Sequence, residues 1–186
     1  VMVSAHYDHV GTDGGLHRLD AVKGSYQEYP GGSARQGGRN EDKIRAIEED
    51  REGDLWIGTL DGGLIRLRLG TGEVVRHRHD PKKPGSLSDD CVHAIRRDRA
   101  GRLWVGTGAG LDLLTSDGEF VGHRRDPRDP TSLADHEVMS LLEDKGGLLW
   151  VGTRGRGEGR RVGAEWGSGR VPVAPKGGEG LSNGYV

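Results

Sequence analysis

The chain has 186 residues with 27 basic and 29 acidic side chains, a formal net charge of −2, and one cysteine among 34 glycines and 7 prolines. The near-neutral charge argues against nucleic-acid binding, the lone cysteine excludes a disulfide framework or multi-cysteine zinc finger, and no apolar run reaches the roughly 18 residues of a membrane span, so we expect no membrane contact. Val1 opens the chain without a secretory pattern, so we expect a mature piece or a fragment.

One pentapeptide recurs three times, as LWIGT at Leu55–Thr59 and as LWVGT at Leu103–Thr107 and Leu149–Thr153. The tryptophans lie 48 and 46 residues apart, and an aspartate stands six residues before each of them. This agreement identifies a repeat, and we place in-phase repeats at 44–91, 92–137 and 138–153. The shared positions, which we interpret as the structural core of the repeat, are Trp56, Gly58, Thr59, Trp104, Gly106, Thr107, Trp150, Gly152 and Thr153.

Residues 1–43 form the first predicted unit, a divergent repeat. GTDGGL at Gly11–Leu16 is in phase with the later copies, with His9 in the tryptophan slot. The preceding SAHYDHVG also resembles the strand end of zinc-dependent aminopeptidases, and that resemblance implies His6 as a metal ligand oriented by Asp8. Such an enzyme needs further ligands and a general base, for which no matching motif is found, so this reading is the weaker alternative.

The repeat at 92–137 shows the expected strands best. Val92–Arg97 leads into an aspartate and glycine turn, Leu103–Thr107 follows, and Leu111–Thr115 and Phe120–Arg124 are joined by an Asp-Gly turn. Within the second strand, Leu103 and Val105 point to one face and Trp104 to the other. Both faces are therefore apolar, and neighbouring copies of the same sheet are expected to cover them.

A leucine marker continues the phase into the C-terminal region. Leu87, Leu133 and Leu181 lie 46 and 48 residues apart, although residues 154–178 have lost the other repeat features. We interpret 154–186 as a degraded blade and expect it to be poorly ordered. A basic arm for anionic partners is the alternative for this arginine-rich and glycine-rich stretch.

The period of 46 to 48 residues and the four short strands per unit predict an all-β protein. We expect a partial β-propeller of about three to four four-stranded antiparallel blades. Helical repeats of similar length compete with this interpretation, but a Gly-Thr pair after each tryptophan and the absence of a capped apolar stripe argue against them.

The pattern V-x-A-I-x-x-D-x-x-G-x-LWVGT-x-x-GL, followed by Asp-Pro-x-x-Pro-x-Ser-Leu, resembles the two-component regulator propeller repeats. Asp98–Leu111 with Asp126–Leu133, and Asp50–Leu64 with Asp80–Leu87, carry the resemblance. It implies the periplasmic or extracytoplasmic sensor region of a bacterial hybrid histidine kinase, with further blades and transmitter domains elsewhere in the parent chain. Seven blades would be expected, so an arc of about four leaves open faces that favour self-association.

Several residues of types that can carry chemistry have structural explanations. The tryptophans are better explained as core between blades than as stacking platforms for sugars, and Asp50, Asp98 and Asp144 as turn initiators rather than metal ligands. Gly106–Gly110 lacks the capped helix of a dinucleotide loop, and Cys91 has no base at a fixed spacing. We therefore predict no catalytic residue, no metal and no cofactor.

The surface prediction is less specific. His77, His79 and His123 stand among charged residues at strand ends, which is typical of a solvated edge. The connecting loops at 81–90 and 127–136 are the longest of each unit, and loops on one face of a propeller are where ligands usually bind. The sequence leaves the ligand-binding residues unknown.

These inferences predict a non-catalytic ligand-sensing or interaction propeller of a bacterial two-component signalling protein, which acts in signal transduction by phosphorelay. The expected partners are an unknown small molecule or saccharide, the remaining blades and the transmitter domains. A propeller scaffold of a non-signalling protein is the alternative, as is a fragment next to a zinc aminopeptidase, because fold does not fix function.

Overall fold

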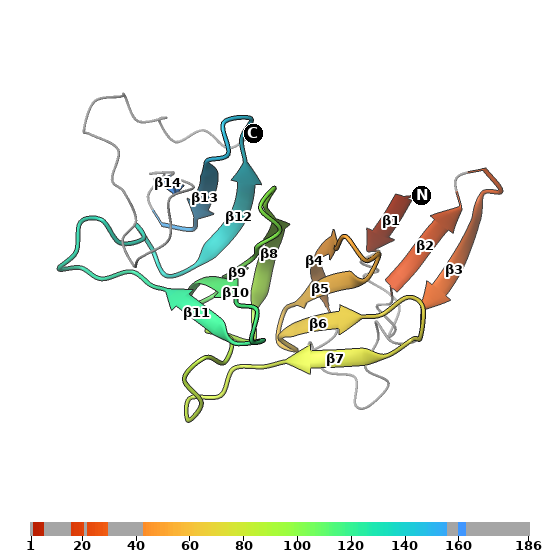
Figure 1. Ribbon diagram of the computed structural model, residues 1–186, viewed down its shortest axis with the longest axis horizontal. Coiled ribbons are helices and arrows are strands. Elements are labelled where there is room, and N and C mark those ends of the chain that lie inside the picture. Colours follow the sequence, from red (N-terminus) through yellow and green to blue (C-terminus); the bar gives the residue numbers. More distant parts are fainter. Residues whose placement is uncertain (1, 6–15, 21, 30–42, 156–159, 163–186) are drawn as a thin grey trace.

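The computed structural model describes residues 2–5, 16–20, 22–29, 43–155 and 160–162 of the chain. These residues form four antiparallel sheets, which we call blades 1 to 4 (Figure 1). Blade 1 holds β1 (Met2–Ala5), β2 (Leu16–Asp20) and β3 (Ser25–Tyr29), and blade 2 holds β4 (Ile44–Glu49), β5 (Leu55–Thr59), β6 (Leu64–Leu67) and β7 (Val74–His77). Blade 3 holds β8 (Val92–Arg97), β9 (Leu103–Thr107), β10 (Gly110–Leu114) and β11 (Phe120–His123), and blade 4 holds β12 (Val138–Glu143), β13 (Leu149–Thr153) and β14 (Arg160–Val162).

Each blade is a meander in which the order of strands in space follows their order in the chain. Blades 2 and 3 are four-stranded, and blades 1 and 4 show three strands among the described residues. A register shift recurs in the first strand of blades 2, 3 and 4, between Ile44 and Ala46, Val92 and Ala94, and Val138 and Ser140. The predicted all-β architecture of antiparallel blades is confirmed.

The hairpin between the first two strands is the same in three blades. Asp50, Asp98 and Asp144 each accept, through the backbone carbonyl, the N–H of a glycine three residues later. Those glycines, Gly53, Gly101 and Gly147, have φ values of 84°, 88° and 82°, a backbone conformation that residues other than glycine rarely adopt. The aspartate and glycine positions of the repeat are thus fixed by one turn geometry.

The hydrophobic core lies between the blades. Trp56 of blade 2 packs into a cluster with Val92, Ile95, Leu103 and Val105 of blade 3. Trp104 of blade 3 belongs to the next cluster, with Val138, Leu149 and Val151 of blade 4, while Leu16 of blade 1 packs with Leu55 and Ile57 of blade 2. Alternate side chains of one strand therefore face opposite neighbours, as predicted for Leu103, Trp104 and Val105.

The blades follow one another around an arc in which their first strands meet. β8 lies between β4 and β12 and contacts both, whereas β7 and β11 lie farther out (Figure 1). The glycine after each Trp-Ile or Trp-Val pair permits this approach, because a methyl group on Gly58 would lie 2.5 Å from Val92 Cγ1, and one on Gly106 would lie 2.7 Å from Val138 Cγ1. The close approach of successive first strands explains why the repeat carries glycine at this position.

Arginine side chains connect the turns of successive blades. Arg51 Nη2 donates to the Arg99 carbonyl at 2.8 Å, and Arg99 donates to the carbonyls of Asp144 and Lys145, each at 2.8 Å. Both arginines immediately follow the turn aspartate and reach toward the next blade along the chain. The same position is thus used twice to join neighbouring sheets.

β4, β8 and β12 begin at Ile44, Val92 and Val138, while the boundaries proposed between the repeats stay predictions. β14 pairs with β13 and comes from the range interpreted as a degraded blade. The expected poor order of 154–186 stays a prediction, because only residues 154, 155 and 160–162 of that range belong to the described part of the chain. Within the described residues, no helix is long and apolar enough to cross a membrane.

Candidate functional site

Strand register places the long connecting loops and the short turns of blade 3 at one edge of the sheets. Val92 pairs with Thr107, and Leu111 pairs with His123, so the start of β8, the end of β9, the start of β10 and the end of β11 lie together. The first connecting loop, residues 78–91, and the second connecting loop, residues 124–137, therefore lie at this edge, which we call the loop face. Loops on such a face are the usual ligand-binding elements of a propeller.

Each connecting loop is closed by the same aspartate and serine pair. The N–H of Asp80 donates to Ser86 Oγ at 3.0 Å, and that hydroxyl donates to the Asp80 carbonyl at 2.9 Å. Asp126 and Ser132 repeat both bonds at 2.8 Å. The Asp-Pro-x-x-Pro-x-Ser motif thus encodes a compact loop of fixed shape.

The leucine after that serine anchors the loop between two blades. Leu87 is fully buried in the cluster that contains Trp56, and Leu133 is buried in the cluster that contains Trp104. The loop is therefore held by apolar burial at its C-terminal end and by the serine bonds across its neck.

A buried carboxylate fixes the first connecting loop further. Asp112 of β10 is fully buried and accepts the N–H of Ser88 at 2.9 Å and the Ser88 hydroxyl at 2.6 Å. Burial raises the pKa of Asp112, while the Ser88 bonds and the charge of Arg124 oppose that rise. Register places Ile65 of blade 2 at the position of Asp112, so β6 offers no carboxylate for such a contact.

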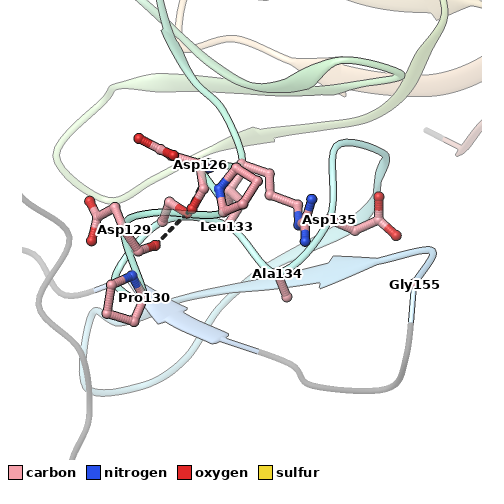
Figure 2. A pocket seen from close by; sticks show the side chains of 10 residues that line it. Asp126, Asp129, Pro130, Leu133, Ala134, Asp135 and Gly155 are labelled. Carbon is pink, nitrogen blue, oxygen red and sulfur yellow. Dashed lines mark hydrogen bonds between the residues drawn. The ribbon is translucent and has the colours of Figure 1, made fainter.

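The second connecting loop borders an open pocket of about 600 Å³ (Figure 2). Three aspartates, Asp126, Asp129 and Asp135, line it together with Arg125 and Leu133. Gly155, which follows β13, lies against the Asp135 carboxylate so closely that a methyl group would collide with it. The lining offers both hydrogen-bond acceptors and donors, and it suits a polar ligand with several hydroxyl or amide groups. The full lining is Arg125, Asp126, Pro127, Asp129, Pro130, Ser132, Leu133, Ala134, Asp135 and Gly155.

A cysteine, a histidine and a glutamate meet where β8 and β12 begin. His93 Nε2 lies 3.5 Å from Cys91 Sγ and 3.2 Å from Glu137 Oε1, and Arg154 Nη1 donates to both Glu137 oxygens at 2.8 and 3.0 Å. In a catalytic triad the nucleophile contacts one nitrogen of the imidazole and the orienting acid contacts the other. Here Cys91 and Glu137 contact the same nitrogen. Burial and Asp89 raise the pKa of the Cys91 thiol, which keeps it protonated. This geometry does not favour a catalytic cysteine.

The three turn aspartates have a second partner that the sequence interpretation missed. Asp50 Oδ2 accepts the indole N–H of Trp56 at 3.3 Å, Asp98 Oδ2 that of Trp104 at 2.9 Å, and Asp144 Oδ2 that of Trp150 at 2.8 Å. Each Oδ1 accepts backbone N–H groups of the turn. The carboxylate therefore ties the turn to the tryptophan, and the constant spacing of six residues was the signal for it.

The acidic group Asp50, Glu52 and Asp54 brings three carboxylates close enough to hold a metal ion. Arg66 Nη2 lies 3.4, 2.8 and 3.0 Å from these carboxylates and already supplies a positive charge there. The group is explained as an ion-pair cluster.

His77 and His123 pack against the tryptophans of their blades. The His77 ring stacks on Trp56 at 5.8 Å, and the His123 ring lies 6.1 Å from that of Trp104. Burial, with the charges of Arg66 and Lys83, lowers the pKa of His77, and burial lowers that of His123 to about 4. Both rings are therefore neutral at pH 7 and lie half-buried against the tryptophans of their own blades, and the His77 ring also meets Phe120 of blade 3 edge to face.

The shared repeat positions lie in the sheets and not in the pocket. Trp56 and Trp104 are 4% and 1% exposed, and Trp150 is partly buried. Thr59 Oγ1 donates to the Gly63 carbonyl at 2.8 Å and Thr107 Oγ1 to that of Gly110 at 3.0 Å, so these hydroxyls hold the turn after the second strand. His6 and Asp8 lie outside the described residues.

Stacked four-stranded meanders with inward first strands define the chain as part of a β-propeller. The family model described as "Two component regulator propeller" matches residues 38–61, 86–109 and 132–155. These three segments of the chain thus match the family of two-component regulator propeller repeats. No curated protein sequence matches the chain.

Solved structures show the same fold. An extracellular domain from B. thetaiotaomicron, described as part of a hybrid two component system, is similar with a TM-score of 0.65 at 20% identity over 80% of this chain. A second such domain from B. thetaiotaomicron has a TM-score of 0.57 at 21% identity over 75% of the chain, and a streptogramin B lyase has 0.59 at 18% over 87%. The chain spans 20% and 18% of the two extracellular domains and 49% of the lyase.

Proposed function

We propose that the chain is a ligand-sensing or interaction segment of the extracytoplasmic propeller of a two-component signalling protein, and that it is non-catalytic. The observation that carries the proposal is the set of three matched repeats, whose loops form one face with a polar pocket. The similar B. thetaiotaomicron structures are extracellular domains, which supports an extracytoplasmic location.

The proposed mechanism uses the rigid connection between loop and core. The second connecting loop lines the pocket, and Leu133 of the same loop is buried between blades 3 and 4. A ligand that binds one arrangement of the loop more tightly would shift the packing of these blades. Distant transmitter domains would read that shift, and a saccharide is the ligand class that we favour.

The non-catalytic part of the proposal is supported by the described polar clusters. Cys91 and Glu137 both contact the same nitrogen of His93, Nε2. In blade 2, the Arg66 guanidinium forms ion pairs with the acidic group. Lyases occur among the similar structures, at identities that show the fold alone. Stoichiometric zinc in the purified chain, lost on His6→Ala, would contradict this part.

The test is calorimetric titration of the 186-residue chain with a panel of soluble oligosaccharides. Arg125→Ala removes a guanidinium from the pocket, and we expect at least a tenfold loss of affinity for any saccharide that binds. Arg128→Ala removes the same charge from a loop residue outside the lining and serves as the matched control. Binding that both variants leave intact would place the ligand elsewhere, and a panel without any binder would contradict saccharide sensing by this chain.

A further inference from the structure

The tryptophan side of blade 4 is less covered than the same side of blades 2 and 3. Trp56 and Trp104 are almost fully buried, whereas Trp150 is only partly buried. Leu142, the cross-strand neighbour of Trp150, is 58% exposed. The side of β12 and β13 that carries Leu142 and Trp150 is called here the open face. Because these side chains are apolar, an apolar partner packed on this face would bury them.

In both complete interfaces, two residues of the following sequence cover the tryptophan. Leu87 and Val92 share a buried cluster with Trp56, and Leu133 and Val138 share one with Trp104. The valine also rests against the glycine two residues after the tryptophan, Val92 on Gly58 and Val138 on Gly106. The leucine comes from the connecting loop, and the valine begins the next first strand.

The sequence after Trp150 repeats the spacing of this pair. Leucine follows tryptophan by 31 residues at Leu87 and by 29 at Leu133, and valine follows leucine by five residues in both cases. Leu181 follows Trp150 by 31 residues, and Val186 follows Leu181 by five. The intervening chain is therefore as long as the one that makes the same connection in blade 2.

We propose that residues 180–186 dock on the open face, with Leu181 over Trp150 and Val186 against Gly152. The docked segment would be the connecting loop and first-strand start of the position after blade 4. Burial of the Leu181 and Val186 side chains against Trp150 and Leu142 supplies the driving force. The Ser140 hydroxyl now lies beside Gly152, so it would turn aside to admit the valine. A second copy of the chain is the competing occupant, because an uncovered apolar sheet face also favours association between copies.

The test measures proximity between the segment and Trp150. A nitroxide on Asn183→Cys, in a Cys91→Ser background, is combined with 5-fluorotryptophan labelling, and the Trp150 resonance is assigned with Trp150→Phe. We expect several-fold broadening of the Trp150 resonance compared with that of Trp56, and its recovery when the nitroxide is reduced. Leu181→Asp should abolish the broadening, while Glu179→Gln, which alters no docking residue, should leave it unchanged.

Two outcomes would overturn the proposal. Equal line widths of Trp150 and Trp56 in the nitroxide-labelled chain would show that the segment does not reach the open face. Broadening that appears only when nitroxide-labelled chains are mixed with fluorinated chains would assign the face to a second copy. Because Asn183 is neither Leu181 nor Val186, its labelling leaves both proposed docking side chains unchanged.

Discussion

The indole N–H of Trp104 donates to Asp98 Oδ2 at 2.9 Å, and both residues are buried. Burial alone raises the pKa of Asp98, but hydrogen bonds from Trp104 and Arg102 outweigh burial and hold the pKa below its ordinary value. The ionised carboxylate is thus the form that the folded chain stabilises. Because the folded-state pKa is depressed, this contribution is present above the unfolded pKa and is lost as the pH falls through the folded value.

Replacement of Asp98 tests this role directly. Asp98→Ala removes the carboxylate that accepts the Trp104 indole N–H and a backbone N–H of the turn. We expect a loss of about 2–3 kcal/mol in the free energy of unfolding, measured with urea. Asp117→Ala in an exposed turn of the same blade is the matched control and should cost less than about 0.5 kcal/mol. Equal effects of the two variants would contradict a special role for Asp98.

Gly106 is expected to tolerate no side chain. A methyl group there would lie 2.7 Å from Val138 Cγ1 and 3.0 Å from the Val138 carbonyl oxygen, so Gly106→Ala must push blade 4 away from blade 3. We expect destabilisation of about 1–3 kcal/mol in thermal or urea unfolding. At Gly70 a methyl group meets no atom within 4 Å, and Gly70→Ala should be neutral. A neutral Gly106→Ala would show that the blades are less tightly stacked than described.

His123 makes stability depend on pH. Its pKa is lowered from 6.5 to about 4 by burial, so the unfolded chain takes up a proton first as the pH falls. Stability is therefore retained above pH 6.5 and decreases toward pH 4, by about 1–2 kcal/mol once partial solvent exposure is considered. His123→Phe should flatten the urea midpoint between pH 7 and pH 4. The exposed His136 offers the control, and a His136→Phe variant with the same flattening would refute the assignment.

Ser88 should control the rigidity of the first connecting loop. Ser88→Ala removes the hydroxyl that donates to Asp112 Oδ1 at 2.6 Å and leaves the buried carboxylate with one Ser88 bond. We expect faster amide hydrogen exchange across 78–91 and a loss of about 1–3 kcal/mol. Ala134 stands at the equivalent position of the second connecting loop, so Ala134→Ser, which meets no such carboxylate partner in the repeat pattern, is the reverse control. Unchanged exchange in Ser88→Ala would mean that Leu87 alone holds the loop.

The stacking of the blades could be predicted from the sequence, because the repeat period and the alternation of side chains along a strand are both local features. The period identified the repeat, and the alternation of Leu103, Trp104 and Val105 assigned the two faces of a strand. The hydrogen bond between Asp98 and Trp104 was harder to predict from the sequence, since a turn aspartate already has backbone partners and burial alone explains the indole. Its trace was the constant spacing of six residues in three copies.

The features of the loop face could not be predicted in the same way. Asp112 and Ser88 are 24 residues apart, and Ile65 and Ala134 stand at the equivalent positions of the neighbouring units, so the repeat gave no indication of the contact. The pocket depends on the fold of the Asp126–Ser132 loop beside Gly155, which register alone does not place. Sequence periodicity thus describes what the blades share, and a ligand site depends on what distinguishes them.

The arginines that join the turns give the stack a direction. Arg51 and Arg99 are donors, and the carbonyls that receive them belong to the blade that follows in the chain. Both of these junctions are consequently heterologous, with unlike surfaces on their two sides, and an incomplete arc built in this way offers acceptors at one end and donors at the other. Such an arrangement extends head to tail until it meets its own beginning, and two arcs placed with like ends together would find no complementary groups.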